Sequence, residues 1–180
     1  RLPFNCKRKI NGSTKCYKRC FLQGKEEIKF IMNFFLPFFI ILIDQLSKAL
    51  VHAKMDINQS FNVIPFLLDF KYIRNEGIAF GINFPGGEIL FVVLPILITI
   101  YMIFLLKNEE FQDNRSQIAL LLIIGGAIGN ILDRIFRGGS VIDFIHLRAG
   151  DWFPYIFNIA DSSVTIGLLF LLYSSILIKK

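Results

Sequence analysis

The sequence predicts a membrane protein of the all-α class: a bundle of four transmembrane helices with a small extracytoplasmic β-sheet or loop insertion between the first two. Three observations carry this prediction. Of the 180 residues, 54% are hydrophobic. The mean hydropathy is +0.55, which is too apolar for an ordinary soluble domain. The apolar residues are also gathered into runs of the length that crosses a bilayer.

Four such runs occur along the chain. The clearest is 89–106, which holds eighteen consecutive uncharged residues, close to the roughly 20 needed to span the hydrocarbon core. The other runs are 118–132, 162–178 and 30–43, the last continuing to about residue 51. Pro37 and Pro95 fall inside two runs, and membrane helices tolerate proline.

The first 31 residues differ in kind from the rest. Residues 1–31 carry nine Lys or Arg against two Glu, whereas 32–180 carry eleven against twelve acids. The basic balance therefore belongs to an N-terminal extension, expected to be non-catalytic, and does not predict nucleic-acid binding. All three cysteines (Cys6, Cys16 and Cys20) lie in this extension without a nearby His, so no zinc site is predicted. Residues 32–180 are expected to form the membrane domain.

The basic extension also predicts the orientation, because Lys and Arg near membrane ends stay cytoplasmic. Four crossings then return the C-terminus to the cytoplasmic side. In this orientation, the polar side chains of the membrane domain lie near the outer face of the membrane. The halves of the helices nearer the cytoplasm carry almost no charged residues. The charged residues concerned are Asp44, Lys48, Asp133, Arg134, Arg137, Asp143 and Asp161.

Spacing groups several of these residues on helix faces. Asn130, Asp133 and Arg137 recur at helical intervals, and the fourth run has a matching stripe. Asp44 and Lys48 form an i,i+4 pair with the acid N-terminal to the base, the favourable order. Gly125-x-x-x-Gly129 gives the third helix a small face for close packing. The matching stripe consists of Asn158, Asp161, Ser162 and Thr165.

Each carboxylate also has an ordinary structural explanation. Asp161 lies three residues after Asn158, where it suits the third position of a capping box. Asp133 beside Arg134, like Asp44 with Lys48, suits an ion pair that stabilises the bundle. Asp143 is harder to explain, because it lies in the apolar segment "VIDFI" with no Lys or Arg within four positions. A carboxylate in such surroundings needs a partner or a proton.

Two carboxylates brought close together share a proton, because one ionised group raises the pKa of the other. Such a pair can activate water and protonate a leaving amine. The sequence lacks the motifs of other catalytic mechanisms: it contains neither H-E-x-x-H nor G-x-S-x-G. His52 and His146 suit ordinary interfacial positions, and Ser47 and Lys48 point about 100° apart on a helix.

Two other functions remain open at this point. A small proton- or ion-coupled transporter would use the Asp pair as a relay, although the polar groups stop at one face of the membrane. A non-enzymatic assembly protein would use the polar stripes to bind partner helices.

Five motifs occur in order: "DQLSK" (44–48), "NEGIAFG" (75–81), "GGAIGNILDRI" (125–135), "GSVIDFI" (139–145) and "FNIADSSVTIG" (157–167). Together they resemble the lipoprotein signal peptidases (signal peptidase II) of bacteria, over about residues 32–180. The resemblance implies a four-helix aspartyl endopeptidase of the bacterial cytoplasmic membrane. It implies cleavage of prolipoproteins on the N-terminal side of a diacylglyceryl-modified cysteine. No metal or organic cofactor is implied, and the expected state is a monomer among membrane lipids.

The resemblance also assigns the site. It places the catalytic dyad on Asp143 and Asp161, and it assigns residues 57–84 to a small extracytoplasmic sheet with a mobile loop. The residues it implies for substrate binding or support of the site are Asn130, Arg134, Asn158, Asp44, Lys48, Asn75, Gly77 and Asp133.

Overall fold

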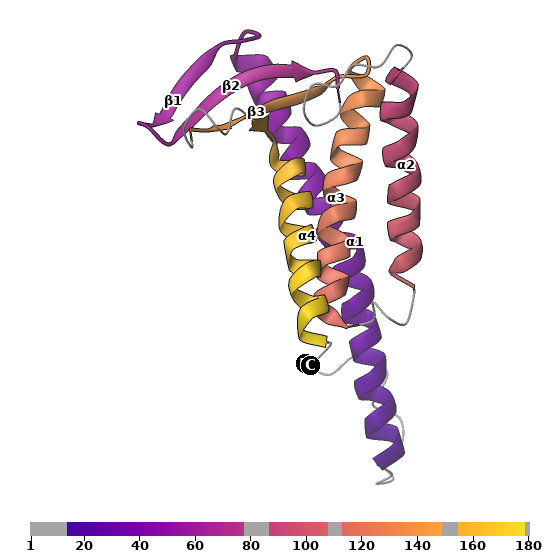
Figure 1. Ribbon diagram of the computed structural model, residues 1–180. Helices are drawn as coiled ribbons and strands as arrows, with labels where there is room; N and C mark the ends of the chain where they lie inside the picture. Colours follow the sequence, from indigo (N-terminus) through magenta and orange to yellow (C-terminus); the bar gives the residue numbers. More distant parts are fainter. Residues whose placement is uncertain (1–13, 78–86, 108–112, 149–154, 179–180) are drawn as a thin grey trace. The chain divides into compact units, whose positions relative to one another are not determined.

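The computed structural model describes residues 14–77, 87–107, 113–148 and 155–178. The chain divides into two compact units, Arg1–Leu36 and Pro37–Lys180, and the site lies wholly in the second. Within these described residues the elements are four helices and four strands, whose arrangement Figure 1 shows. The helices are α1 (Thr14–Lys54), α2 (Gly87–Leu105), α3 (Asn114–Phe136) and α4 (Ile159–Ile178).

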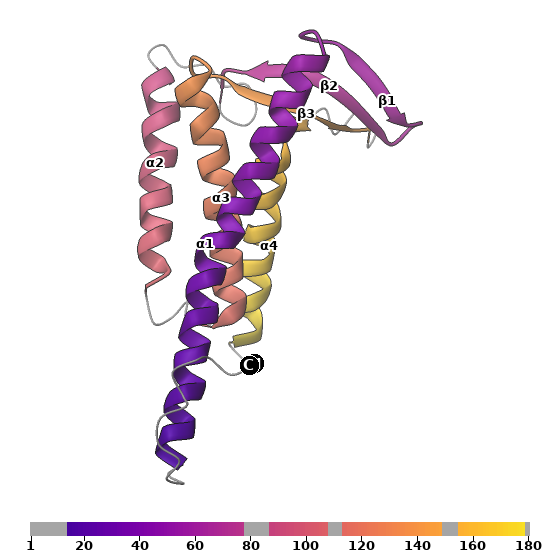
Figure 2. The same ribbon diagram turned by 180° about the vertical axis from the view of Figure 1, so that it is seen from behind.

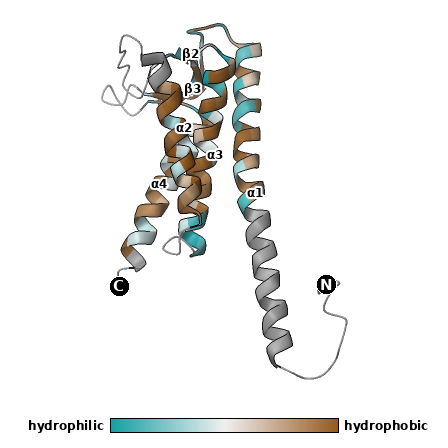
Figure 3. Ribbon diagram, turned by 90° about the vertical axis from the view of Figure 1, so that its right-hand side faces the viewer, coloured by the Kyte–Doolittle hydropathy of each residue, from teal (hydrophilic) through white to brown (hydrophobic). Residues whose placement is uncertain are grey.

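Three helical segments of the described chain are long and apolar enough to cross a membrane: Asn33–Lys54, Asn114–Phe136 and Ile159–Ile176. The described apolar part of α2, Phe91–Leu105, is shorter. Hydrophobic residues run along these helices, with hydrophilic bands on α1 (Figure 3). The prediction of a membrane protein with apolar helices is therefore confirmed, while the count of four crossings stays a prediction.

Helix α1 begins much earlier than expected. The apolar pattern predicted a start near Met32, but α1 begins at Thr14. The segment in between is rich in Lys, Arg, Glu and Gln and has no proline before Pro37. These residues have high helix propensity, so the helix extends into the basic extension, for which no helix was predicted.

The sheet has four antiparallel strands in the order β1-β2-β3-β4. β1 (Ser60–Ile64) and β2 (Leu68–Asn75) come from the insertion between α1 and α2, as predicted. β3 (Val141–Leu147) and β4 (Ile156–Phe157) come from the connection between α3 and α4. The assignment of the sheet to 57–84 alone was thus incomplete. The part of the expected mobile loop at residues 78–84 lies outside the described residues.

The sheet is attached to the end of α1 through a small apolar core. Met55, Tyr72, Ile142 and Phe144 are buried together, and Val51 of α1 packs against them. Figure 2 shows the last turns of α1 reaching the sheet. This core fixes β3 between β2 and the helices, and β3 carries Asp143.

The small face of α3 allows the helices to approach closely, as predicted. A Cβ added to Gly126 would lie 2.3 Å from the carbonyl oxygen of Ala160 in α4. A Cβ on Gly125 would lie 3.1 Å from the side chain of Ile40 in α1. The glycines therefore allow α1 and α4 to pack on α3, and this packing holds the first turn of α4, with Asp161, against α3.

Candidate active site

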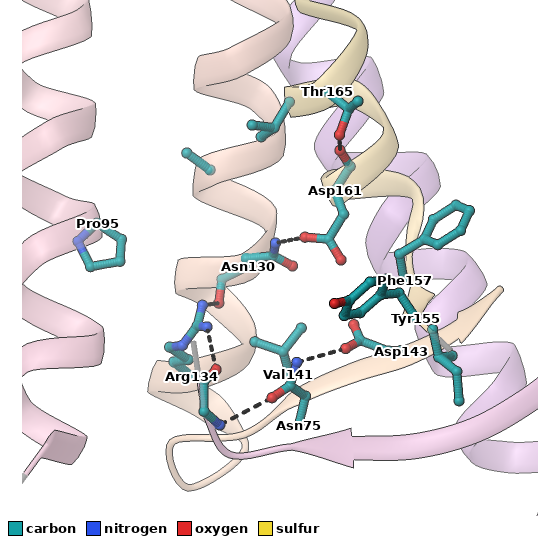
Figure 4. Close-up of a pocket in the computed structure, with 14 residues that line it drawn as sticks. Asn75, Pro95, Asn130, Arg134, Val141, Asp143, Tyr155, Phe157, Asp161 and Thr165 are labelled. Carbon is teal, nitrogen blue, oxygen red and sulfur yellow. Dashed lines mark hydrogen bonds between the residues drawn. The ribbon is translucent and has the colours of Figure 1, made fainter. Parts of the chain in front are cut away.

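A pocket of about 600 Å³ lies where the sheet meets the ends of the helices (Figure 4). Its polar wall contains Asn75 from β2, Asn130 and Arg134 from α3, Asp143 from β3 and Asp161 from α4. The rest of the lining is mostly apolar or small: Gly77, Pro95, Ala127, Val141, Tyr155, Ile156, Phe157, Val164 and Thr165. The pocket thus brings together the two carboxylates that lie eighteen positions apart in the sequence.

Asp143 is held by two amide groups. Its side chain is 1% exposed. Oδ2 accepts a hydrogen bond from Nδ2 of Asn75 at 3.0 Å, and Oδ1 accepts one from Nδ2 of Asn158 at 2.6 Å. The Asn75 amide is oriented by the backbone N–H of Gly77, which donates to its Oδ1 at 3.0 Å. The sequence shows no evident partner for Asp143, but the structure supplies one from β2 and one from the residue directly before α4.

The environment raises the pKa of Asp143. Burial is the largest cause, and repulsion from Asp161 adds to it, so the pKa rises from 3.8 to about 7. The hydrogen bonds from Asn75 and Asn158 and the charge of Lys48 act in the opposite direction. Asp143 therefore carries a proton under neutral to mildly acidic conditions, where an exposed Asp is ionised.

Asp161 lies in the first turn of α4 and forms the predicted capping box. Its backbone N–H donates to Oδ1 of Asn158 at 2.8 Å, and its Oδ2 accepts from the backbone N–H of Asn158 at 3.3 Å. Its Oδ1 also accepts a hydrogen bond from Nδ2 of Asn130 at 2.7 Å. The helix-start explanation of Asp161 is correct, and the same carboxylate lines the pocket.

Asn158 connects the two carboxylates. It is fully buried, and its side chain contacts Asp143 through Nδ2 and the backbone of Asp161 through Oδ1. Because the cap fixes which end of the amide faces α4, the donor end must face Asp143. One residue therefore contacts both carboxylates, Asp143 through its side-chain amide and Asp161 through its backbone N–H.

Behind the pocket, Asp44, Lys48 and Asp133 form a buried cluster. The predicted Asp44–Lys48 pair is confirmed, with Nζ 2.8 Å from Oδ2 of Asp44. The predicted pairing of Asp133 with Arg134 is wrong. Asp133 instead contacts Lys48 at 3.0 Å and Arg137 at 3.2 Å, and it accepts the backbone N–H of Ile142.

Arg134 faces the pocket because adjacent helix residues point in different directions. Its guanidinium donates to the carbonyl oxygens of Asn130 at 3.5 Å and Gly77 at 3.4 Å, both long contacts. Its Nε is buried and has no hydrogen-bond partner among the described residues. The guanidinium of Arg134, whose N–H groups make only long hydrogen bonds, thus lines the same wall of the pocket as the two carboxylates.

Sequence reasoning missed several residues. Gln45 bridges the buried cluster, donating to Asp44, to the carbonyl of Gly129 and to Asp133. The only feature of the sequence that indicated a role for Gln45 was its position inside the motif "DQLSK". Tyr155 and Phe157 line the pocket from the segment before α4. Nothing in their local pattern indicated a pocket.

The competing chemistries are not assembled in the described part of the chain. Ser47 Oγ donates to the carbonyl of Asp44 at 2.7 Å, whereas Lys48 points into the buried cluster. His52 contacts the Tyr72 hydroxyl, and His146 lies 3.6 Å from Asp69. Neither histidine lines the described pocket.

Two carboxylates at one pocket, the fully buried Asp143 beside the half-buried Asp161, form the arrangement typical of aspartic peptidases, in this case one within a membrane protein. The family model described as signal peptidase (SPase) II matches residues 36–177. The chain belongs to this family, and the resemblance drawn from its motifs is confirmed.

Two relatives named lipoprotein signal peptidase illustrate the similarity. The protein from Staphylococcus aureus (strain bovine RF122 / ET3-1) is 38% identical over 135 residues, which is 74% of this chain and 81% of the relative. The protein from Chlorobium phaeobacteroides is 39% identical over 157 residues, or 81% of this chain and 92% of the relative.

Two solved structures described as a bacterial membrane enzyme have the same fold. One has a TM-score of 0.74 at 35% identity and covers 81% of this chain and 87% of its own. The other has a TM-score of 0.72, also at 35% identity, and covers 79% of this chain and 91% of its own.

Proposed function

We propose that this chain is a membrane aspartic endopeptidase that removes signal peptides from diacylglyceryl-modified prolipoproteins. It cuts on the N-terminal side of the lipidated cysteine, with Asp143 and Asp161 as its catalytic pair. The observation that carries the assignment is that one buried residue, Asn158, contacts both carboxylates at one pocket: its side-chain amide donates to Asp143 and its backbone N–H donates to Asp161. The family and the names of the relatives supply the substrate class.

The pair operates with one shared proton. Asp143, with its raised pKa, hydrogen-bonds the carbonyl oxygen of the scissile peptide, while the ionised Asp161 takes a proton from a water molecule. The water oxygen bonds to the carbonyl carbon. The C–N bond then breaks, and a proton from the pair passes to the leaving amine of the lipidated cysteine. The second product is the signal peptide with a new carboxyl terminus.

Arg134 supports substrate binding in this scheme. Its guanidinium lies on the pocket wall with an unpartnered Nε and two long hydrogen bonds. Acceptors on the substrate backbone match these donors, since guanidinium groups donate and never accept. Gly77 and Asn75 lie at the edge of the same wall and complete the binding surface around Asp143.

The proposed enzyme is a monomer that crosses the bacterial cytoplasmic membrane four times, with both termini cytoplasmic. The pocket then opens near the outer face, where a lipid-modified substrate reaches it sideways from the bilayer. Residues 1–31 act as a non-catalytic extension. The gathering of charged residues at one end of the bundle supports this arrangement, because charges deep in a bilayer are costly.

The pH dependence of cleavage tests the shared proton. Asp143 is protonated below its pKa of about 7 and ionised above it. We therefore expect kcat/KM for a diacylglyceryl-modified prolipoprotein to fall about tenfold for each unit of pH above roughly 7. The measurement is the initial cleavage rate in detergent micelles between pH 5 and 9, with folded protein confirmed at each pH. A rate that stays constant to pH 9 contradicts the role of Asp143 as the acid.

A further inference from the structure

The fully buried Lys48 lies outside the pocket, and the catalytic scheme does not use it. Its ammonium has three acceptors: Oδ2 of Asp44 at 2.8 Å, Oδ2 of Asp133 at 3.0 Å and Oδ1 of Asn130 at 2.9 Å. An ammonium has three protons to donate and cannot accept. Two of the contacts are ion pairs, whereas the third goes to a neutral amide that lines the pocket.

That third contact fixes the orientation of Asn130. Because Lys48 only donates, the amide must present its oxygen to Nζ, and its nitrogen is left to face the pocket. There Nδ2 donates to Oδ1 of Asp161 at 2.7 Å. Asn158 reinforces the same orientation by donating to Oδ1 of Asn130 at 3.2 Å. If the side-chain amide of Asn130 had the opposite orientation, its oxygen would face the Asp161 carboxylate and its nitrogen would face the Lys48 ammonium.

We infer that Lys48 is a positioning residue for the peptidase reaction, acting through Asn130 on Asp161. It contacts neither the pocket nor, in our scheme, the substrate. Its role is to hold the amide so that its N–H stabilises the ionised form of Asp161, the form that activates water. Asp44 and Asp133 keep the ammonium in place, and their charges are balanced by Lys48 and by Arg137. This inference rests on the proposed catalytic pair.

The charge of Lys48 also reaches Asp143. The charged groups that act on the Asp143 carboxylate are Asp161 from α4, which raises its pKa, Lys48 from α1, which lowers it, and Arg134 from α3, with which it also interacts. Asn75 on β2 and Asn158 are neutral donors. Removal of the ammonium should therefore raise the pKa of Asp143 further. This effect gives a readout that a purely structural role for Lys48 would not produce.

A single Lys48→Met change would leave Asp44 buried without its cation, which is expected to prevent folding, whereas Asp133 keeps Arg137. The test therefore uses pairs of variants in which Asp44 is already neutral. Asp44→Asn is compared with Asp44→Asn/Lys48→Met, and independently Asp44→Asn/Asp133→Asn with Asp44→Asn/Asp133→Asn/Lys48→Met. Within each pair only the lysine differs, and the variant that keeps Lys48 sets the reference for folding and activity. Either pair suffices if the other does not fold.

We expect Lys48→Met to lower kcat by about 10- to 100-fold in either background, the usual range for residues that orient an active group. KM should stay within about twofold, because Lys48 does not touch the substrate. The alkaline limb of the pH profile should move up by roughly half a pH unit or more. Equal kcat and equal pH profiles within a pair would overturn the inference, as would a loss of activity with an unmoved pH profile. If neither the wild type nor the variants that keep Lys48 cleave, the proposed function itself fails.

Discussion

We expect the replacement of either Asp143 or Asp161 with Asn to abolish cleavage of a diacylglyceryl-modified prolipoprotein, with a fall in kcat/KM of about 10⁴-fold or more. Asn keeps the size of the side chain but can neither take a proton from water nor return one to the leaving amine. The measurement is cleavage by detergent-purified variants at matched amounts of folded protein. Asp56→Asn is the control, because Asp56 is an exposed carboxylate outside the pocket.

Asp143→Asn should also stabilise the protein, which separates a catalytic role from a structural one. A pKa raised from 3.8 to about 7 corresponds to a destabilisation on the order of 4 kcal/mol above pH 7. In the wild type this penalty is absent below pH 3.8 and grows as the pH rises to about 7. Asn avoids it but loses one of the two amide hydrogen bonds, a loss of about 1–3 kcal/mol.

The advantage of Asp143→Asn in thermal unfolding should therefore be larger at pH 8 than at pH 5. Full activity in either Asn variant would show that the replaced residue has only a structural role. That role would be a helix cap for Asp161 or a sheet residue for Asp143. A variant that loses activity only in proportion to its folded fraction would contradict the catalytic assignment as well.

Gly126→Ala is the second change with a large expected effect. The new Cβ would lie 2.3 Å from the carbonyl oxygen of Ala160 and 2.8 Å from Cγ2 of Val164. Because the first neighbour is backbone, α3 and α4 must move apart, and we expect a loss of about 3 kcal/mol in stability. Asp161 follows Ala160 directly, so cleavage should fall as well. The measurements are the thermal unfolding midpoint and the cleavage rate in detergent.

Gly125→Ala is the matched control on the same helix. Its Cβ would lie 3.1 Å from the flexible side chain of Ile40 and from the Cα of Pro37, and small adjustments of tenths of an ångström relieve these contacts. We expect its destabilisation to be less than half that of Gly126→Ala. Equal effects at the two positions would show that close packing of α3 on α4 does not set the stability of the bundle.

Local patterns were sufficient to predict much of this site. The capping box at Asn158 and Asp161 and the Asp44–Lys48 pair each depend on residues within one turn of helix, so spacing alone predicted them. The small face at Gly125 and Gly126 was predicted for the same reason. The motifs then identified the family, which supplied the pairing of Asp143 with Asp161.

Contacts between distant segments were not predictable in the same way. No strand was predicted for the apolar segment around Asp143, but it forms β3, which pairs with β2. Its strand structure could not be predicted because strand pairing depends on a partner far away in the sequence. Asp133 has a neighbour of opposite charge in the sequence, yet it pairs with Lys48 of α1 and Arg137. The aromatic wall of the pocket, Tyr155 and Phe157, likewise becomes visible only once α4 is placed.

The most direct test of the central claim is intact-mass analysis of the products that the purified protein releases from a diacylglyceryl-modified prolipoprotein. The same prolipoprotein without the lipid, and the Asp143→Asn/Asp161→Asn double variant, are measured beside it. We predict one new product that begins at the lipidated cysteine, formed by the wild type alone and only from the modified substrate. Equal cleavage by the double variant, or a cut at another bond, would contradict the proposed reaction.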